Sequence, residues 1–473
     1  MMISRKILLL LLTLPIILGL IVGSQIINDE NIEQRELIQD SCNIRTENNN
    51  KYIKEYVIPN RCSAPVAITI DDEGLVWFIE NNHSKLVSFN PGKKSFIEYQ
   101  ISEVYLDVQS WSIIAVNNEI WFTDHQNNLI WKYIKSESRF EYYRLLTENA
   151  YPVQILNNKN QMIVSEIFGK KIAILEIDQL VTNTTNGINE ISPEIDLDVL
   201  GGIAIDDENR IWYTMLTWPI EGYLGSYKDG EFISYKLPKE ISSPVGISIR
   251  ENQIWINDHG SSQFVLFNLE NNTFTNYVTS SSKSDFTTTL PYWNKFDNNG
   301  NIWMNLHQSN TIAKMDIEKM ILIEYEIPTK NLDWGGISNP LQFDIDNQGN
   351  IWFTEWTENK IAMLDTKKPL EFDIESSTRE IIIDSNKVGE MILTIEPKKQ
   401  LDVEIIITGT FTKNGSIKNV SITVEQIENE FNVKKEIPIL IKSENLSRGT
   451  YTIMVSVESG EITQSIPIKL IMK

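Results

Sequence analysis

Acidic and histidine side chains recur at fixed distances after a repeated tryptophan-containing motif, xIWF. Acids stand three residues after the tryptophan position, and histidines stand four residues after it. A carboxylate next to an imidazole, as in residues 123–125 (TDH) and 257–259 (NDH), is a pairing that metal sites and general bases both use. The acids are Glu80, Asp124, Glu166, Asp258 and Glu355, and the histidines are His125, His259 and His307. The spacing predicts one site built from equivalent turns of a repeat.

Two of these histidines are the candidate catalytic pair. His259 and His307 belong to consecutive repeats, so we expect that they can meet. His125 belongs to a repeat across the ring, and we expect it to lie too far away to share one ion with them. In the alternative interpretation, the histidines and acids only cap turns through side-chain hydrogen bonds.

Aromatic side chains predicted near the same face would suit a sugar or a peptide ligand. The candidate rings are Trp111, Tyr292, Trp293 and Trp356. Packing between neighbouring sheets is the alternative role for each ring. The acids and His125 are further candidates for ligand contact. The residue types leave room for a divalent cation at this mouth, with the metal and its ligands unknown.

The tryptophan of the motif marks a repeat with a period of about 45 residues. It occurs at Trp77, Trp121, Trp212, Trp255, Trp303 and Trp352, and Ile163 takes its place in a seventh copy. The steps between copies are 44, 42, 49, 43, 48 and 49 residues. Short strands and turns at this period are typical of a β-propeller, so we predict an all-β fold with seven blades.

Each copy is predicted to form four strands, which make one blade. Neighbouring blades cover both faces of a blade, and this explains continuous apolar runs such as VWF at residues 76–78. The six tryptophans are predicted to fill the wedges between blades. The last copy stops after its third strand at Asp365. Residues 51–59 are therefore predicted to supply the missing strand and close the ring, with residues 369–375 as the alternative.

The chain divides into four predicted parts. Residues 1–28 are a signal peptide or a membrane anchor, 29–50 a stalk, 51–366 the propeller and 367–473 an immunoglobulin-like β-sandwich. The sandwich is predicted because β-branched residues alternate with polar ones after Asp365, in about seven short strands. All twelve tryptophans precede that boundary.

The N-terminal segment predicts export. Arg5 and Lys6 precede residues 7–23, which carry no charge and are expected to form an apolar helix. At about 1.5 Å per residue this run spans roughly 25 Å, the short limit for crossing a membrane. Whether it stays as an anchor or is cleaved, the remainder is placed outside, at the cell surface or secreted.

Cysteines and glycosylation motifs agree with an exported chain, and the net charge limits its partners. Cys42 and Cys62 can pair outside the cell, with two unpaired thiols as the alternative. Acids outnumber Lys and Arg by 64 to 42, giving a net charge of −22, and this excludes nucleic acid as a partner. Weaker support comes from six N-glycosylation motifs, which begin at Asn82, Asn183, Asn271, Asn414, Asn419 and Asn445.

The repeat resembles that of the virginiamycin B (streptogramin) lyase family. The resemblance rests on residues 350–365 (NIWFTEWTENKIAMLD), 321–328 (ILIEYEIP), 243–249 (SPVGISI) and 74–80 (GLVWFIE). It covers roughly residues 51–365 and implies a seven-bladed propeller. It also implies a reaction, in which a histidine base and a Mg²⁺ held by acids open a cyclic depsipeptide by elimination.

The residues that carry this lyase chemistry are not matched here. The base would follow the proline of a first strand, and after that proline or its equivalent this chain has Val66, Trp111, Val153, Gly201, Val245, Tyr292 and Leu341. Asn339 and Trp356 occupy the positions of the two metal-binding acids. We therefore expect an extracellular module that binds a small-molecule, peptide or glycan ligand or a surface protein. The alternative is a lyase or metal-assisted hydrolase with an altered site.

Overall fold

The computed structural model describes residues 46–217, 221–384, 388–402, 410–413, 416–419, 422–424, 430–442 and 448–473. Strands dominate these residues, and the helical segments among them are short 3-10 turns. Within these ranges no helix has the length and apolarity needed to cross a membrane. The predicted apolar helix of residues 7–23 and Cys42 lie outside the described residues. The membrane anchor and the disulfide between Cys42 and Cys62 therefore stay predictions.

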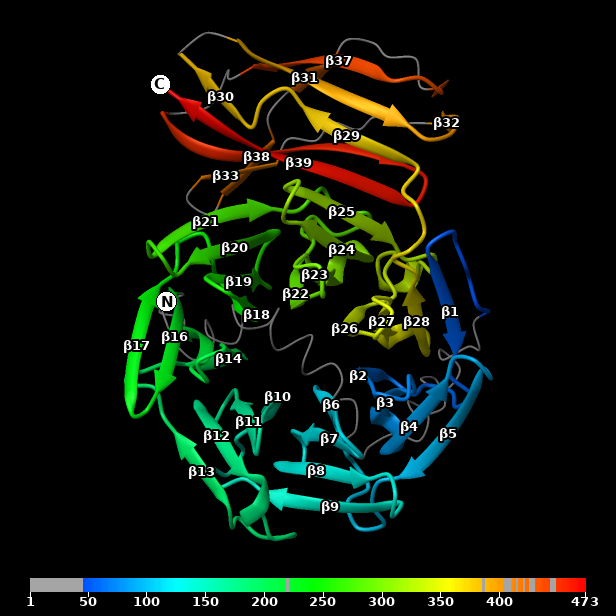
Figure 1. Cartoon of the computed structure of the whole chain (residues 1–473), viewed down its shortest axis with the longest axis vertical. Helices are drawn as coiled ribbons and strands as arrows, with labels where there is room; N and C mark the ends of the chain where they lie inside the picture. The colour runs from blue at the N-terminus through cyan, green and yellow to red at the C-terminus, as the bar shows by residue number, and fades with distance from the viewer. Residues whose placement is uncertain are drawn as a thin grey trace, which may run out of the picture. The chain divides into compact units, whose positions relative to one another are not determined.

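Four-stranded antiparallel sheets arranged in a ring make up residues 53–364, with the first strand of each sheet nearest the centre (Figure 1). Three sheets contain β2 (Pro65–Ile70), β3 (Val76–Glu80), β4 (Lys85–Asn90) and β5 (Ser95–Gln100); β6 (Ile113–Val116), β7 (Glu119–Asp124), β8 (Leu129–Ile134) and β9 (Arg139–Arg144); and β10 (Pro152–Asn158), β11 (Gln161–Glu166), β12 (Lys171–Glu176) and β13 (Ile188–Ile191). The next three contain β14 (Val199–Ile205), β15 (Ile211–Thr217), β16 (Glu221–Lys228) and β17 (Glu231–Lys236); β18 (Pro244–Arg250), β19 (Gln253–Asp258), β20 (Gln263–Asn268) and β21 (Thr273–Val278); and β22 (Pro291–Phe296), β23 (Ile302–Leu306), β24 (Thr311–Asp316) and β25 (Ile321–Glu326). This arrangement is a β-propeller, and the predicted all-β class is confirmed.

The last sheet of the ring joins the two ends of this region. β26 (Pro340–Ile345), β27 (Ile351–Glu355) and β28 (Lys360–Leu364) pair in order, and β1 (Ile53–Val57) pairs antiparallel with β28. The alternative closing segment contains β29 (Phe372–Ser376), which pairs instead with β31 (Val388–Pro397). The prediction that an N-terminal strand closes the ring is confirmed, and β28 is not left as an open edge.

The repeated tryptophans lie in the core between neighbouring sheets, as predicted. The most exposed of the six shows only 4% of its surface. Four of their indole N–H groups donate to an aspartate six residues earlier in the chain. Trp77 Nε1 lies 2.8 Å from Asp71, and Trp303 Nε1 lies 2.9 Å from Asp297. A buried indole thus keeps a hydrogen-bond partner, which allows the ring to fill the wedge at little cost.

The C-terminal residues form further β-sheets, and one of these continues a sheet of the ring. β29, β31, β37 (Lys435–Lys442) and β35 (Ile422–Val424) form one sheet. β39 (Ile462–Met472) pairs with β38 (Gly449–Ser459), with β30 (Glu380–Ile383) and with β25 of the ring. Short pairs join β32 (Leu401–Asp402) to β36 (Glu430–Phe431) and β33 (Thr410–Lys413) to β34 (Ser416–Asn419). The all-β character of this part agrees with the prediction.

Candidate functional site

One face of the ring collects the turns that follow each second strand. Antiparallel pairing places the start of an inner strand beside the end of the second strand, as for Pro152 and Glu166 or Pro340 and Glu355. The turn to the third strand and the loop from the preceding sheet therefore meet at this face. We call this face the mouth. The sequence-predicted site residues of the propeller belong to it, except for Trp293, which lines the channel further in.

His259 and His307 meet at the mouth, as expected from their consecutive repeats. His259 Nε2 lies 3.3 Å from His307 Nδ1, and His307 Nε2 lies 2.9 Å from Asn339 Oδ1. The Asn339 oxygen can only accept, so His307 donates through Nε2 and its Nδ1 accepts from His259 Nε2. A chain of hydrogen bonds thus runs from His259 through His307 to Asn339 and fixes the orientation of both rings.

Burial keeps this imidazole pair neutral. Burial lowers the pKa of His259 to about 3, with the neighbouring His307 adding to the effect. Burial also lowers the pKa of His307 to about 4, although the hydrogen bond with Asn339 opposes the shift. Groups with a pKa this low are weak bases at neutral pH, but they can hydrogen-bond to a polar ligand. Among the described residues, no group of three or more His, Cys, Asp or Glu side chains is placed to hold a metal ion.

A row of rings crosses the channel beside the imidazole pair. Tyr292 packs against His259 with ring centroids 4.6 Å apart, and Trp111 approaches Tyr292 to 6.5 Å. His125 packs against Tyr151 at 4.4 Å and stands 6.1 Å from Trp111. Aromatic rings therefore separate His125 from the other two histidines, as expected. Side chains from four sheets meet in one place.

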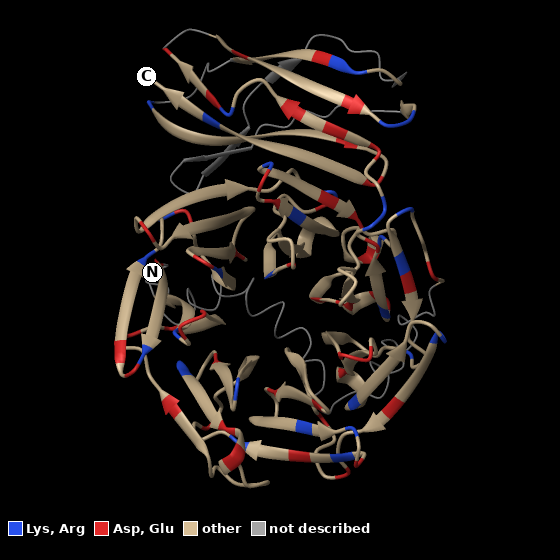
Figure 2. Cartoon of the chain, viewed as in Figure 1, with Lys and Arg blue, Asp and Glu red and all other residues tan. Residues whose placement is uncertain are grey.

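The predicted acids do not form an exposed rim, and this corrects our expectation of an acidic surface for ligand contact. The buried acids are Glu80, Asp124, Glu166, Asp258 and Glu355. Asp124 accepts from the indole of Trp131 at 3.0 Å, and Asp258 accepts from the backbone N–H of Ser243 at 2.6 Å. Buried donors in the turns need acceptors, and the carboxylates of Asp124 and Asp258 supply them. Charged residues of both signs occur around the whole ring (Figure 2).

The positions that match the lyase metal ligands hold a carboxamide and an indole. Trp356 N donates to Asn339 O at 3.2 Å, and the Trp356 ring stands 6.4 Å from that of Trp334. Magnesium prefers carboxylate and other hard oxygen ligands, which an indole cannot replace. The residues present therefore do not fit the family's metal. Leu341, at the position of the catalytic base, is buried.

The sequence analysis missed two residues of this site. It treated Asn339 only as a lost acid, yet Asn339 orients His307, and it did not single out Tyr151, which packs on His125. Both residues immediately precede the proline that opens an inner strand, at Pro340 and Pro152. The residue before that proline is therefore the signal that could have found them.

Comparisons with known proteins agree with this architecture. The model of the virginiamycin B lyase family matches residues 43–259. A streptogramin B lyase structure is 21% identical over 66% of this chain and 97% of that chain, with a TM-score of 0.57. A catalytically inactive virginiamycin B lyase from Staphylococcus aureus with quinupristin is 20% identical over 66% of this chain and 98% of that chain, with a TM-score of 0.56.

A different similarity reaches further along the chain. The extracellular domain of the putative one-component system BT4673 from B. thetaiotaomicron is 11% identical over 90% of this chain and 59% of that chain, with a TM-score of 0.50. No curated protein sequence matches the chain. The fold and the mouth define a β-propeller with an aromatic and imidazole site at one end of its channel. Its repeats make it a virginiamycin B lyase-like propeller.

Proposed function

We propose that this chain is an extracellular ligand-binding module, a seven-bladed propeller whose mouth takes a small-molecule, peptide or glycan ligand or a surface protein. The observation that carries the proposal is the set of rings from separate sheets that meets beside the neutral His259–His307 pair. Aromatic faces next to fixed hydrogen-bonding groups suit a ligand with an apolar side and a polar edge.

The loops around the mouth support this proposal with further apolar contact area. They connect one sheet to the next, after β5, after β21 and after β25. Their exposed apolar side chains are Val104, Leu106, Phe286, Leu332 and Trp334. Apolar side chains that gather around one opening are a common feature of surfaces that bind a partner.

The proposal includes the division of the chain and its location. Residues 1–28 would direct export and serve as a membrane anchor unless cleaved, and residues 367–473 would form an immunoglobulin-like sandwich after the propeller of residues 51–366. The similarity to the extracellular domain of the one-component system extends over 90% of this chain, whereas the similarity to the streptogramin B lyase extends over 66%. This difference in length supports a second domain after the propeller. Protease digestion of intact cells tests the location, with an exposed chain expected to be cut.

Binding at the mouth is tested by probing glycan and short-peptide arrays with the purified full chain. We expect the spots that wild type retains to weaken at least about tenfold with Tyr292→Ala and with His307→Ala. Tyr99→Ala, a change of the same size on the outer strand β5, is the control and should bind like wild type. Retention of the same spots by the mouth variants, or the lack of any retained spot, would count against the proposal.

A lyase or hydrolase of altered site is the second candidate, favoured by the neutral imidazole pair at the mouth. The test is incubation with quinupristin, with and without Mg²⁺, followed by mass spectrometry. We expect the ring of the compound to stay closed, because Leu341, Asn339 and Trp356 replace the base and the acids. Ring opening by wild type that is lost in His307→Ala would show that the chain is an enzyme and would contradict the binding proposal.

A further inference from the structure

The central channel holds a second, separate cavity. It has a volume of about 430 Å³ and is lined by all seven inner strands, from β2 through β26. Its lining begins at the level of Trp293 and extends to residues near the far ends of the strands, such as Phe296 and Asp344. A cavity of this size falls in the range of small-molecule sites, roughly 300–1,000 Å³.

Aromatic rings separate this cavity from the mouth. Tyr292 belongs to the mouth and the next residue, Trp293, lines the cavity, with their ring centroids 5.2 Å apart. Gln342 lines the cavity too, and its Nε2 donates to Trp111 O at 2.7 Å, which joins the two sheets that flank the sheet of β2. The mouth and the cavity are thus lined by different residues.

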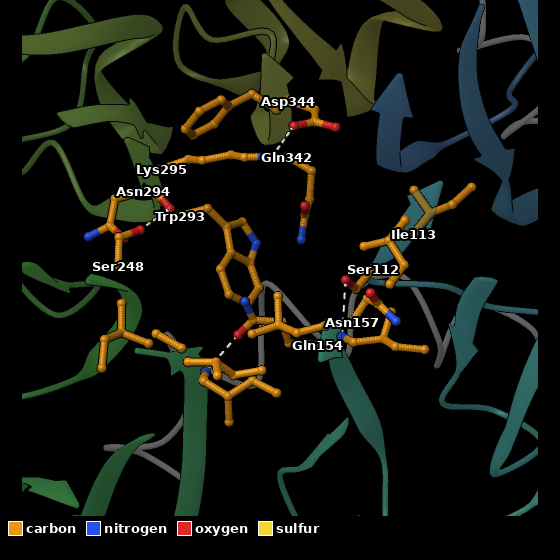
Figure 3. Close-up of a pocket in the computed structure, with 18 of the residues that line it drawn as sticks. Ser112, Ile113, Gln154, Asn157, Ser248, Trp293, Asn294, Lys295, Gln342 and Asp344 are labelled. Atoms are coloured by element: carbon orange, nitrogen blue, oxygen red, sulfur yellow. Dashed lines mark hydrogen bonds and ion pairs between the residues drawn. The ribbon is translucent and has the colours of Figure 1, made fainter. Parts of the chain in front are cut away.

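The indole of Trp293 points into the cavity and has an unused donor (Figure 3). Trp293 is 6% exposed, and its Nε1 has no hydrogen-bond partner among the residues that the structure describes. Leaving a buried donor without an acceptor is unfavourable, so a ligand acceptor placed here would strengthen binding. The indole therefore marks where a ligand oxygen would lie.

Two carboxamides stand beside the indole. Gln154 Oε1 accepts from Ile203 N at 2.7 Å, which leaves its amide donors for a ligand. The Gln342 bond to Trp111 uses a donor, which leaves its carbonyl oxygen as an acceptor. Together with Trp293, this end of the cavity offers donors and an acceptor side by side, a pattern that matches an amide group.

Both apolar and polar residues line the cavity. Ile114, Leu156 and Ala204, from β6, β10 and β14, supply apolar contact area. β18, β22 and β26 face them with Ser248, Asn294, Lys295 and Asp344. Lys295 and Asp344 form an ion pair with each other (Figure 3). Asp344 also accepts from Thr69 Oγ1 at 2.9 Å. The fixed charges are already paired, which favours an uncharged ligand.

We propose that this cavity binds a small uncharged amide with an aliphatic substituent, such as a blocked amino acid or the equivalent part of a short peptide. The amide would meet Trp293, Gln154 and Gln342, and the aliphatic group would lie on the wall of Ile114 and Leu156. This site is independent of the mouth and of its proposed function.

The test is binding of N-acetyl-leucinamide to the purified full chain, followed by ligand-observed NMR and calorimetry. We expect saturable millimolar binding that weakens about five- to tenfold with Trp293→Phe, which removes one hydrogen bond and keeps the ring. Ile114→Trp should abolish binding because it fills the cavity. Trp255→Phe, a matched change between two sheets, should bind like wild type.

Each other outcome overturns the proposal in a defined way. An absence of saturable binding by wild type excludes the site, and unchanged binding by Ile114→Trp places the amide elsewhere. Binding of free leucine or glucose in preference to the amide shows that the ligand class is wrong. Loss of array binding by Tyr292→Ala tests only the ligand site at the mouth. The proposal for the mouth and the proposal for the cavity can therefore fail independently of each other.

Discussion

At the scale of single residues, the neighbouring carboxylates of Glu166 and Glu190 differ in protonation state at neutral pH. Burial raises the pKa of Glu166 to about 8, and the nearby charge of Glu190 adds to the effect. Glu190 is also buried, but bonds from Thr147 and from Lys171 at 2.9 Å outweigh burial and lower its pKa. Glu166 therefore keeps its proton at neutral pH while Glu190 holds the negative charge.

We predict that Glu166→Gln stabilises the protein as the pH rises. The ordinary pKa of 4.5 in the unfolded chain lies below the folded value of about 8, so the folded state binds more protons in this window. Wild type therefore loses stability as the pH rises from 4.5 to 8, whereas the neutral glutamine does not. Denaturant unfolding at pH 7 should show a gain of about 1–3 kcal/mol in unfolding free energy.

The matched control for this prediction is Glu190→Gln. It removes a charge that Thr147 and Lys171 stabilise, so it should lower the unfolding free energy at pH 7. If Glu166→Gln is no more stable than wild type at pH 7, or if its advantage does not grow between pH 5 and pH 7, Glu166 is ionised in the folded protein.

The sequence predicted the meeting of His259 and His307 because a repeat register fixes where equivalent turns lie. It could not predict that the acids of the same register are buried. Burial depends on which turn N–H groups need an acceptor, and those donors come from segments distant in sequence, such as Ser243 for Asp258. The cavity beneath Trp293 was not predicted for a similar reason, because its lining combines residues from seven strands that are distant in sequence.

At the scale of elements, β1 is held in the ring by a buried ion pair as well as by its ladder. Lys360 Nζ of β28 lies 2.6 Å from Glu55 Oε2 of β1, and both side chains are fully buried. Thr329 connects to both, with its hydroxyl 2.6 Å from Lys360 Nζ and 2.8 Å from Glu55 Oε2. The contact that closes the ring therefore also binds the loop that arrives from β25.

We predict that Lys360→Met weakens ring closure. It leaves the Glu55 carboxylate buried without its cation, and breaking a buried pair in this way costs about 3–5 kcal/mol. The measurement is the unfolding free energy in denaturant. Lys85→Met is the control, because Lys85 and Glu98 form a partly exposed pair whose loss should cost less than about 1 kcal/mol. Equal effects of the two changes would mean that the buried pair does not hold β1.

The sequence predicted most of the ring at this scale. The period of the tryptophan motif set the place of each second strand, and the missing fourth strand of the last copy pointed to residues 51–59. The aspartate partner of the indoles was not predicted, although the six-residue spacing of Asp71 and Trp77 recurs three more times. The pairing of β25 with β39 was also missed, because it joins segments about 140 residues apart.

At the scale of the whole molecule, the propeller and the C-terminal sheets share one core. β25 is buried along almost its whole length, whereas the equivalent outer strands β5 and β17 are largely exposed. β39 pairs with β25 from Leu322 to Tyr325, and Met454 of β38 packs in a cluster with Trp255 and Leu322. A shared core predicts that the two parts unfold together.

We predict that Met454→Ala lowers the unfolding free energy of both parts by about 2–5 kcal/mol, because it opens a cavity in the shared cluster. All twelve tryptophans lie in the propeller, so tryptophan fluorescence reports on the propeller while far-UV circular dichroism reports on both parts. The two midpoints should coincide in wild type and move together in the variant. Val433→Ala, at an exposed position of the C-terminal part, should move neither. A fluorescence midpoint that stays at the wild-type value while the dichroism midpoint falls would show that the propeller is stable without its C-terminal neighbour.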